Sequence, residues 1–153
     1  MKTKNNHIIG WREWVALPEF DLPHIKAKVD TGARTSALHA YFVEPFHKGE
    51  EEWVRFGVHP LQRNSRIEKV CVAPIIDKRW VTDSGGHKEE RYVISTDIKI
   101  ADTVFNAELT LTNRDTMIFR MLLGRTALKK RFVIDPARSY LMGEYHPLKK
   151  HKP

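Results

Sequence analysis

The stretch from Val29 to Ala40 reads VDTGARTSALHA, and the fold prediction begins from it. It follows a run, 24–29, in which apolar and polar residues alternate as in a strand with one buried face. Asp30 then starts a turn in which Gly32 supplies backbone freedom. Backbone N–H groups can hold a carboxylate at such a turn and present it to a cleft, where it can activate water. An ordinary strand-to-loop turn would use the same residues, since Asp-Thr-Gly arises by chance in roughly 1–2% of chains this long.

Strand patterns continue along most of the chain. Apolar residues alternate with polar ones in three further stretches, 54–58, 92–100 and 105–111. The short link at 101–103 predicts a hairpin between the last two. Only RTALKKRF has a helical pattern, and it predicts one short helix near 125–130. The sequence therefore predicts a mainly all-β fold, a small β-barrel with one short C-terminal helix.

Three segments are predicted to be irregular: 46–52, 59–66 and 83–90. The third reads DSGGHKEE and lies between the strand-like sequences RWVT and RYVIST. This placement predicts the tip of a long hairpin, which two glycines make mobile.

The composition is that of a single globular domain, with 41% apolar residues and a net charge of +7. Residues 125–153 contain eight Lys and Arg and two acids, so we expect one folded domain over 1–142 and a basic tail over 143–153. The tail is either a solvated terminus or a segment that attracts a polyanion. Cys71 is the only cysteine, which favours the reducing cytoplasm. No apolar run approaches the ~18 residues of a membrane helix, so we expect no membrane association.

The order of the motifs carries a family resemblance. The Asp-Thr-Gly-Ala loop, the glycine-tipped hairpin, and then MLLGR before a short helix resemble the retropepsin-like aspartic peptidases. More closely, IGWREWVALPE (9–19) together with IKAKVDTGARTSALHA (25–40) resembles the RimB family, which is associated with the RimK glutamate ligase. The resemblance covers roughly residues 8–140. It implies a retropepsin-like barrel that hydrolyses peptide bonds by general acid–base chemistry.

The resemblance also implies roles for the matching residues. Asp30 would be the catalytic carboxylate, Thr31 would tie two active-site loops together, and Gly32 would let backbone approach closely. The apolar-apolar-Gly segment 122–124 would lie beneath the loop, and 83–90 would be the flap over the substrate. The predicted catalytic residues are Asp30, Thr31 and Gly32, and the predicted substrate-binding residues are Ala33, Arg34, Asp83, Ser84, Gly85, Gly86, His87 and Arg125.

The sequence departs from the retropepsin pattern in two ways. It has one Asp-Thr-Gly, so either two chains meet at Asp30 in a homodimer or the site works alone, with His39 as the candidate helper. Arg34 stands where retroviral enzymes often have an acid, so Arg125 must find another acid. We interpret Arg34 as a clamp for a substrate carboxylate, against the alternative of a solvated arginine. Ala33 cannot donate a side-chain hydrogen bond to the carboxylate, which suits a site working at cytosolic pH.

No cofactor is expected. The family is often labelled an ATP-dependent zinc protease, but the chain has no His-Glu-x-x-His motif, no thiolate set and no phosphate-binding glycine loop. The basic tail and the link to RimK suggest an acidic peptide or a glutamylated ribosomal protein tail as substrate, with a RimK-type ATP-grasp ligase as a partner. The alternative is a non-catalytic β-barrel that binds RNA or the ribosome. The aromatic residues argue against this alternative, because they form no recognisable motif for stacking on bases.

Overall fold

The structure is a computed structural model that describes residues 7–60, 68–83, 85–113 and 117–143. The strands, in chain order, are β1 (His7–Gly10), β2 (Arg12–Leu17), β3 (Leu22–Val29), β4 (Ser36–His39), β5 (Phe42–Lys48), β6 (Glu51–Val58), β7 (Lys69–Pro74), β8 (Asp77–Thr82), β9 (Lys88–Ile100), β10 (Thr103–Thr112), β11 (Met121–Leu123) and β12 (Phe132–Asp135). A 3₁₀ turn, η1 (Pro18–Phe20), joins β2 to β3, and α1 (Arg125–Leu128) is the one α-helix of the described residues.

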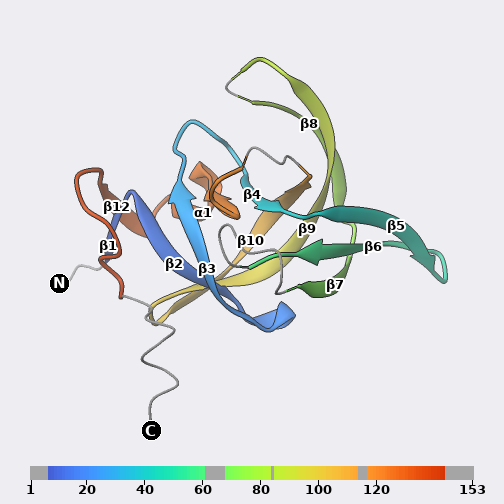
Figure 1. The fold of residues 1–153 in the computed structure, drawn as a ribbon, viewed down its shortest axis with the longest axis horizontal. Helices are drawn as coiled ribbons and strands as arrows, with labels where there is room; N and C mark the ends of the chain where they lie inside the picture. Colours follow the sequence, from blue (N-terminus) through green and yellow to red (C-terminus); the bar gives the residue numbers. More distant parts are fainter. Residues whose placement is uncertain (1–6, 61–67, 84, 114–116, 144–153) are drawn as a thin grey trace, which may run out of the picture.

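Six strands of the described residues close a barrel in the order β10-β4-β11-β3-β2-β9, because β9 also pairs with β10. The predicted all-β barrel with one short C-terminal helix is therefore confirmed (Figure 1). The alternation in β3 is confirmed too, with Ile25 and Ala27 fully buried. The β9–β10 hairpin turns through 101–102, where Ala101 adopts a φ of 54°.

A second sheet, β5-β6-β7, extends to the right of the barrel in Figure 1. Its existence corrects the prediction that 46–52 is irregular. Phe46 pairs with Trp53 and Lys48 with Glu51, and Gly49 takes a φ of 66° in the tight turn between them. Acidic residues at a solvated hairpin end were mistaken for a loop. Of the segment 59–66, most lies outside the described residues.

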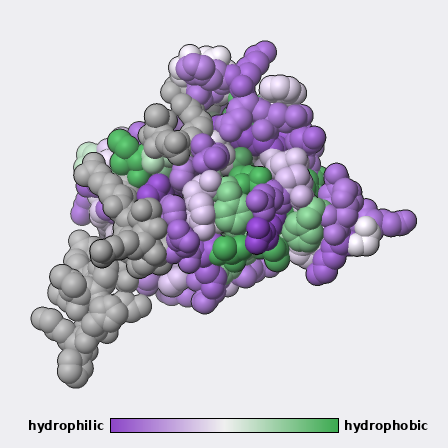
Figure 2. All heavy atoms as spheres, turned by 45° about the vertical axis from the view of Figure 1, so that its right-hand side comes forward, coloured by the Kyte–Doolittle hydropathy of each residue, from purple (hydrophilic) through white to green (hydrophobic). Residues whose placement is uncertain are grey.

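The barrel interior and the inner face of the second sheet form one apolar core. Its members include Ile25, Leu38, Phe56, Ile98 and Leu123, all fully buried. Figure 2 shows the face carried by the right-hand side of Figure 1, where hydrophilic side chains surround a smaller apolar area. None of the described helices is long and apolar enough to cross a membrane.

The last described segment is fastened to β2 by a buried carboxylate. Glu13 is fully buried, and its two oxygens accept hydrogen bonds from the backbone N–H groups of Gly10, Leu141 and Met142 at 2.7, 2.8 and 3.1 Å. Three N–H donors are a suitable replacement for the water that the carboxylate loses on burial. The predicted basic tail, 143–153, lies outside the described residues apart from Gly143.

Candidate active site

Asp30 stands at the end of β3, where the chain leaves the barrel. Its backbone N–H donates to the carbonyl of Leu123 at 2.9 Å, and its carbonyl accepts from Ala33 N–H at 3.1 Å, closing a tight turn. Its Oδ1 accepts from Gly32 N–H at 3.1 Å. The side chain is half-buried, so the carboxylate is oriented by backbone and still open to a ligand.

The apolar-apolar-Gly segment lies against this loop, as expected. Strand β11 pairs in parallel with β3 and antiparallel with β4, which places Gly124 beside the loop. A Cβ at Gly124 would lie 2.6 Å from the carbonyl carbon of Thr35, so only glycine fits there. The N–H of Gly124 donates to Ser36 Oγ, which is fully buried, at 2.9 Å.

Arg125 holds the loop from the other side. Its Nη1 donates to the carbonyls of Thr31 and Gly32 at 3.0 and 3.1 Å, and its backbone N–H donates to the carbonyl of Ala33 at 2.8 Å. We expected Arg125 to find another acid, but none of the ion pairs among the described residues includes it. Two carbonyl oxygens, which carry partial negative charge, take the place of the carboxylate that Arg34 replaces in this sequence.

The segment predicted to be the flap forms the end of the β8–β9 hairpin, which we call the flap below. Thr82 pairs with Lys88, so the turn comprises 83–87, shorter than the predicted 83–90. Asp83 organises it: Oδ1 accepts from the N–H groups of Gly85 and His87 at 2.8 and 2.9 Å. The predicted flap residue Ser84 lies outside the described residues, Gly86 takes a φ of 86°, and the His87 side chain is 82% exposed.

A groove separates the flap from the Asp30 loop. One cavity, of about 390 Å³, is lined by Asp30, Gly32 and Ala33 on one side and by residues 81–83 of the flap on the other. A second, of about 260 Å³, shares five of these lining residues and adds Arg34. Because the two cavities share a wall, they form one elongated groove. Strand β8 is an edge strand, so an extended peptide in the groove could add to the sheet.

Several polar residues of this groove were missed from the sequence. Arg91, only 7% exposed, lines the Asp30 cavity together with Thr112, and Glu89 hydrogen-bonds to both. The alternation over 92–100 predicts one buried face and begins after Arg91, so it gives no reason to expect a buried arginine there. In the structure the first part of β9 is covered on both faces, since Val93 and Ile94 are both fully buried. The signal available in the sequence was a charged residue, Arg91, within a stretch that is predicted to be a strand.

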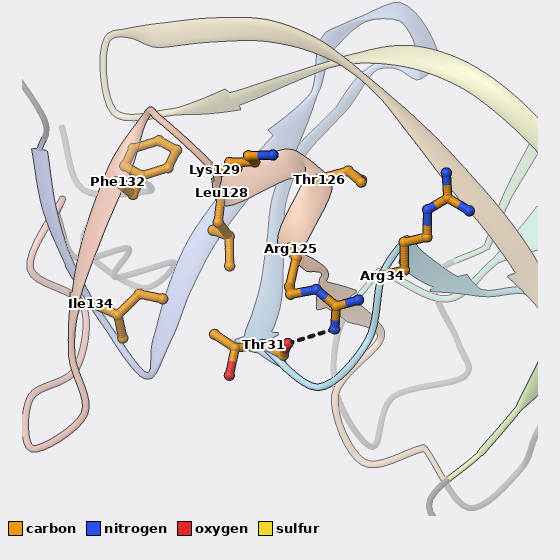
Figure 3. Close-up of a pocket in the computed structure, with 8 residues that line it drawn as sticks. All are labelled: Thr31, Arg34, Arg125, Thr126, Leu128, Lys129, Phe132 and Ile134. Atoms are coloured by element: carbon orange, nitrogen blue, oxygen red, sulfur yellow. Dashed lines mark hydrogen bonds between the residues drawn. The ribbon is translucent and has the colours of Figure 1, made fainter.

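A third cavity, of about 640 Å³, lies behind the Asp30 loop (Figure 3). Its walls are Leu128 from α1 and Phe132 and Ile134 from β12, and Thr31 stands at its edge. The figure shows Arg125 reaching from α1 to the Thr31 carbonyl, with Arg34 at the opposite side of the view from Phe132. Asp30 is not among the residues that line this cavity.

The candidate helper His39 is not brought to the site. It is buried in β4, where its backbone N–H donates to the carbonyl of Arg120 at 2.8 Å, and it does not line the cavity that holds Asp30. Gly32 has open space around it within this chain, because an added Cβ would only reach Asp30 Oδ1 at 3.4 Å. In the described part of the chain no three His, Cys, Asp or Glu residues are grouped to hold a metal ion.

The barrel and the site together define a class. A single Asp-Thr-Gly-Ala loop, supported by an apolar-apolar-Gly segment and faced by a hairpin, is similar to the half-site of the retropepsin-like aspartic peptidases. The model of the RimB-like family, described as retropepsin-like aspartic endopeptidase RimB, matches residues 8–144. The chain belongs to this family, as its resemblance indicates.

Proteins of known name or structure are similar to most of this chain. A probable alpha-L-glutamate ligase of Desulfotalea psychrophila is 50% identical over 137 residues, which are 90% of this chain and 30% of that protein. One of Shewanella pealeana is 45% identical over 140 residues, 92% of this chain and 31% of that protein. The chain thus spans about a third of these relatives. A Legionella pneumophila protein of unknown function has a crystal structure with a TM-score of 0.74 and 27% identity, covering 90% of this chain and 99% of that one.

Proposed function

We propose that this chain is an aspartic peptidase that hydrolyses peptide bonds in acidic, glutamate-rich peptides. The observation that carries the proposal is the Asp30 carboxylate, which accepts a hydrogen bond from the Gly32 N–H at the wall of a groove made of two adjoining cavities. In the proposed reaction Asp30 takes a proton from water, and the water oxygen attacks the scissile carbonyl. A second acid protonates the leaving nitrogen.

The second acid is proposed to be Asp30 of another copy. The described part of this chain contains no second Asp-Thr-Gly, and His39 does not line the cleft. Thr31, which the resemblance assigns to contacts between two such loops, is exposed at the edge of the 640 Å³ cavity, whose apolar walls could receive a second chain. Two carboxylates that close would share one proton. Light scattering across a dilution series, with activity measured in parallel, tests this: full activity in a strict monomer excludes the dyad.

The substrate class is proposed from charge and from the named relatives. Arg34 is exposed beside the groove, and no ion-pair partner for it occurs among the described residues. A free guanidinium suits a carboxylate, which it can bind through two hydrogen bonds. The relatives named as glutamate ligases contain this domain within a longer protein, which supports an association with a RimK-type ligase that builds glutamate chains.

The test is incubation with glutamate-rich peptides, read by mass spectrometry, for the unchanged protein, Asp30→Asn and Asp102→Asn. Asp102 is the matched control, because it is also followed by threonine but lies in the exposed β9–β10 turn without glycine. Cleavage should vanish in Asp30→Asn and persist in Asp102→Asn. Cleavage that survives in Asp30→Asn refutes the assignment. Retained binding of an RNA without any cleavage would instead favour the non-catalytic module.

A further inference from the structure

Arg91 occupies a special place in the groove. Among the described residues that line the 390 Å³ cavity with Asp30, it is the only cation. It comes from β9, beneath the flap, and its side chain is 7% exposed. Arg34 differs, because it is exposed and lines the neighbouring cavity. The described part of the groove therefore has three guanidinium groups: those of Arg34 and Arg79 line the neighbouring cavity, and that of Arg91 lines the cavity with Asp30. Arg79 is already paired with Asp77 and Glu108.

The Arg91 guanidinium is fixed in one orientation. Its Nε donates to Glu89 Oε2 at 3.1 Å and its Nη1 donates to Thr110 Oγ1 at 3.3 Å. Thr112 Oγ1 donates to the two Glu89 oxygens at 3.1 and 3.0 Å, so Glu89 is itself held. Among the described residues Nη2 has no hydrogen-bond acceptor, although it belongs to a side chain that lines the cavity. A charged donor is thus held in place with one nitrogen still able to donate.

Structural support alone accounts poorly for this arrangement. A buried ion pair contributes little net stability, because desolvation offsets the attraction, and apolar residues could join β9 to β10 at least as well. A pre-oriented guanidinium in a water-poor wall is a suitable donor for an anionic ligand, since little reorganisation is needed on binding.

We propose that Arg91 forms a carboxylate subsite in the Asp30 cleft, where it binds the side-chain carboxylate of a glutamate residue in the substrate. The inference rests on the proposed peptidase function and names the group that selects the substrate. Glutamine has a similar shape but no charge, so it forms a weaker hydrogen bond with Arg91. Glu89 competes with the ligand for the same guanidinium and limits its affinity. Arg34 attracts the acidic peptide from solution, and Arg91 binds the side-chain carboxylate of one of its glutamate residues.

The test measures peptide binding to the Asp30→Asn protein, so that no turnover occurs. Fluorescence anisotropy gives the dissociation constants of labelled hexaglutamate and hexaglutamine at 0.5 M NaCl, where the attraction to exposed Arg34 is screened. Hexaglutamate should bind about tenfold more tightly or better. Adding Arg91→Gln should reduce that ratio by about fivefold or more, and adding Glu89→Gln should increase it. These two changes remove opposite charges from one network, so a general loss of packing cannot reproduce their opposite effects.

Arg55→Gln is the control for net charge, because Arg55 is half exposed on β6, paired with Glu44, and is not among the residues lining the groove. It should leave the ratio unchanged. An equal ratio in the Asp30→Asn protein and in its Arg91→Gln derivative overturns the subsite, as does the absence of any preference for hexaglutamate. Failure of the peptidase assay refutes the proposed function instead, since binding is measured without catalysis.

Discussion

Gly124→Ala tests whether the contact between β11 and the Asp30 loop positions the site. The added Cβ would lie 2.6 and 2.8 Å from the carbonyl carbon and oxygen of Thr35 and 2.9 Å from the backbone nitrogen of Ser36. All three are backbone atoms, so no side-chain rotation can relieve the overlap. The chain must move by roughly 0.5 Å or more to restore ordinary contact distances.

The expected cost follows from this displacement. Overpacking a close-packed site costs about 1–3 kcal/mol of unfolding free energy. The same movement disturbs the hydrogen bonds from Gly124 N–H to Ser36 Oγ and from Arg125 N–H to the Ala33 carbonyl, now 2.9 and 2.8 Å. A shift of ~1 Å at a reacting group can reduce a rate by about 10²-fold. We therefore expect lower stability together with a loss of kcat/KM near 10²-fold.

Urea denaturation gives the stability, and hydrolysis of a glutamate-rich peptide well below the unfolding midpoint gives the rate. Gly10→Ala is the matched control, because its Cβ would lie 2.2 Å from the carbonyl oxygen of Arg138, away from the groove. It should destabilise the protein at least as much and leave kcat/KM of the folded fraction within about twofold. Unchanged stability in Gly124→Ala, or equal loss of kcat/KM in both variants, would refute the reasoning.

Three further predictions concern other parts of the molecule. Glu13→Gln puts an amide NH₂ against at least one of the three backbone N–H groups that donate to Glu13. We therefore expect urea denaturation to show a loss of about 1–3 kcal/mol of unfolding free energy, with faster amide exchange at Leu141 and Met142. Unchanged exchange would contradict the role of Glu13 in holding this segment. Asp83→Ala removes the acceptor of two flap N–H groups, so exchange at Gly85 and His87 should accelerate and KM should rise while global stability changes by less than about 1 kcal/mol. Burial raises the pKa of the Cys71 thiol from 9.0 to about 11, so the folded protein should react slowly with iodoacetamide at pH 8. Because the unfolded thiol releases its proton first, the contribution of Cys71 to stability should be constant below pH 9 and fall between pH 9 and about 11, which urea midpoints of the protein and of Cys71→Ala compare directly.

The sequence alone was sufficient to predict the all-β barrel with its short C-terminal helix. Period-two alternation in β3, β6, β9 and β10 identifies strands with a buried face, and it depends only on the geometry of extended backbone. The loop at Asp30, the flap hairpin and the helix after Gly124 were also located, because glycine positions and turn chemistry act over a few residues. Where solvated charges occupy a hairpin end, as over 46–52, the local pattern misleads.

Only the tertiary structure decided how these segments make a site. Ala37, Arg91 and Thr112 lie far apart in the sequence, and pairing of β4, β9 and β10 brings them to the cavity that Asp30 lines. The same pairing buries His39 away from the cleft and gives Arg125 two carbonyl oxygens to bind in place of an acid. Spacing along the chain carries no information about such contacts, because strand order and register determine which side chains share a cavity.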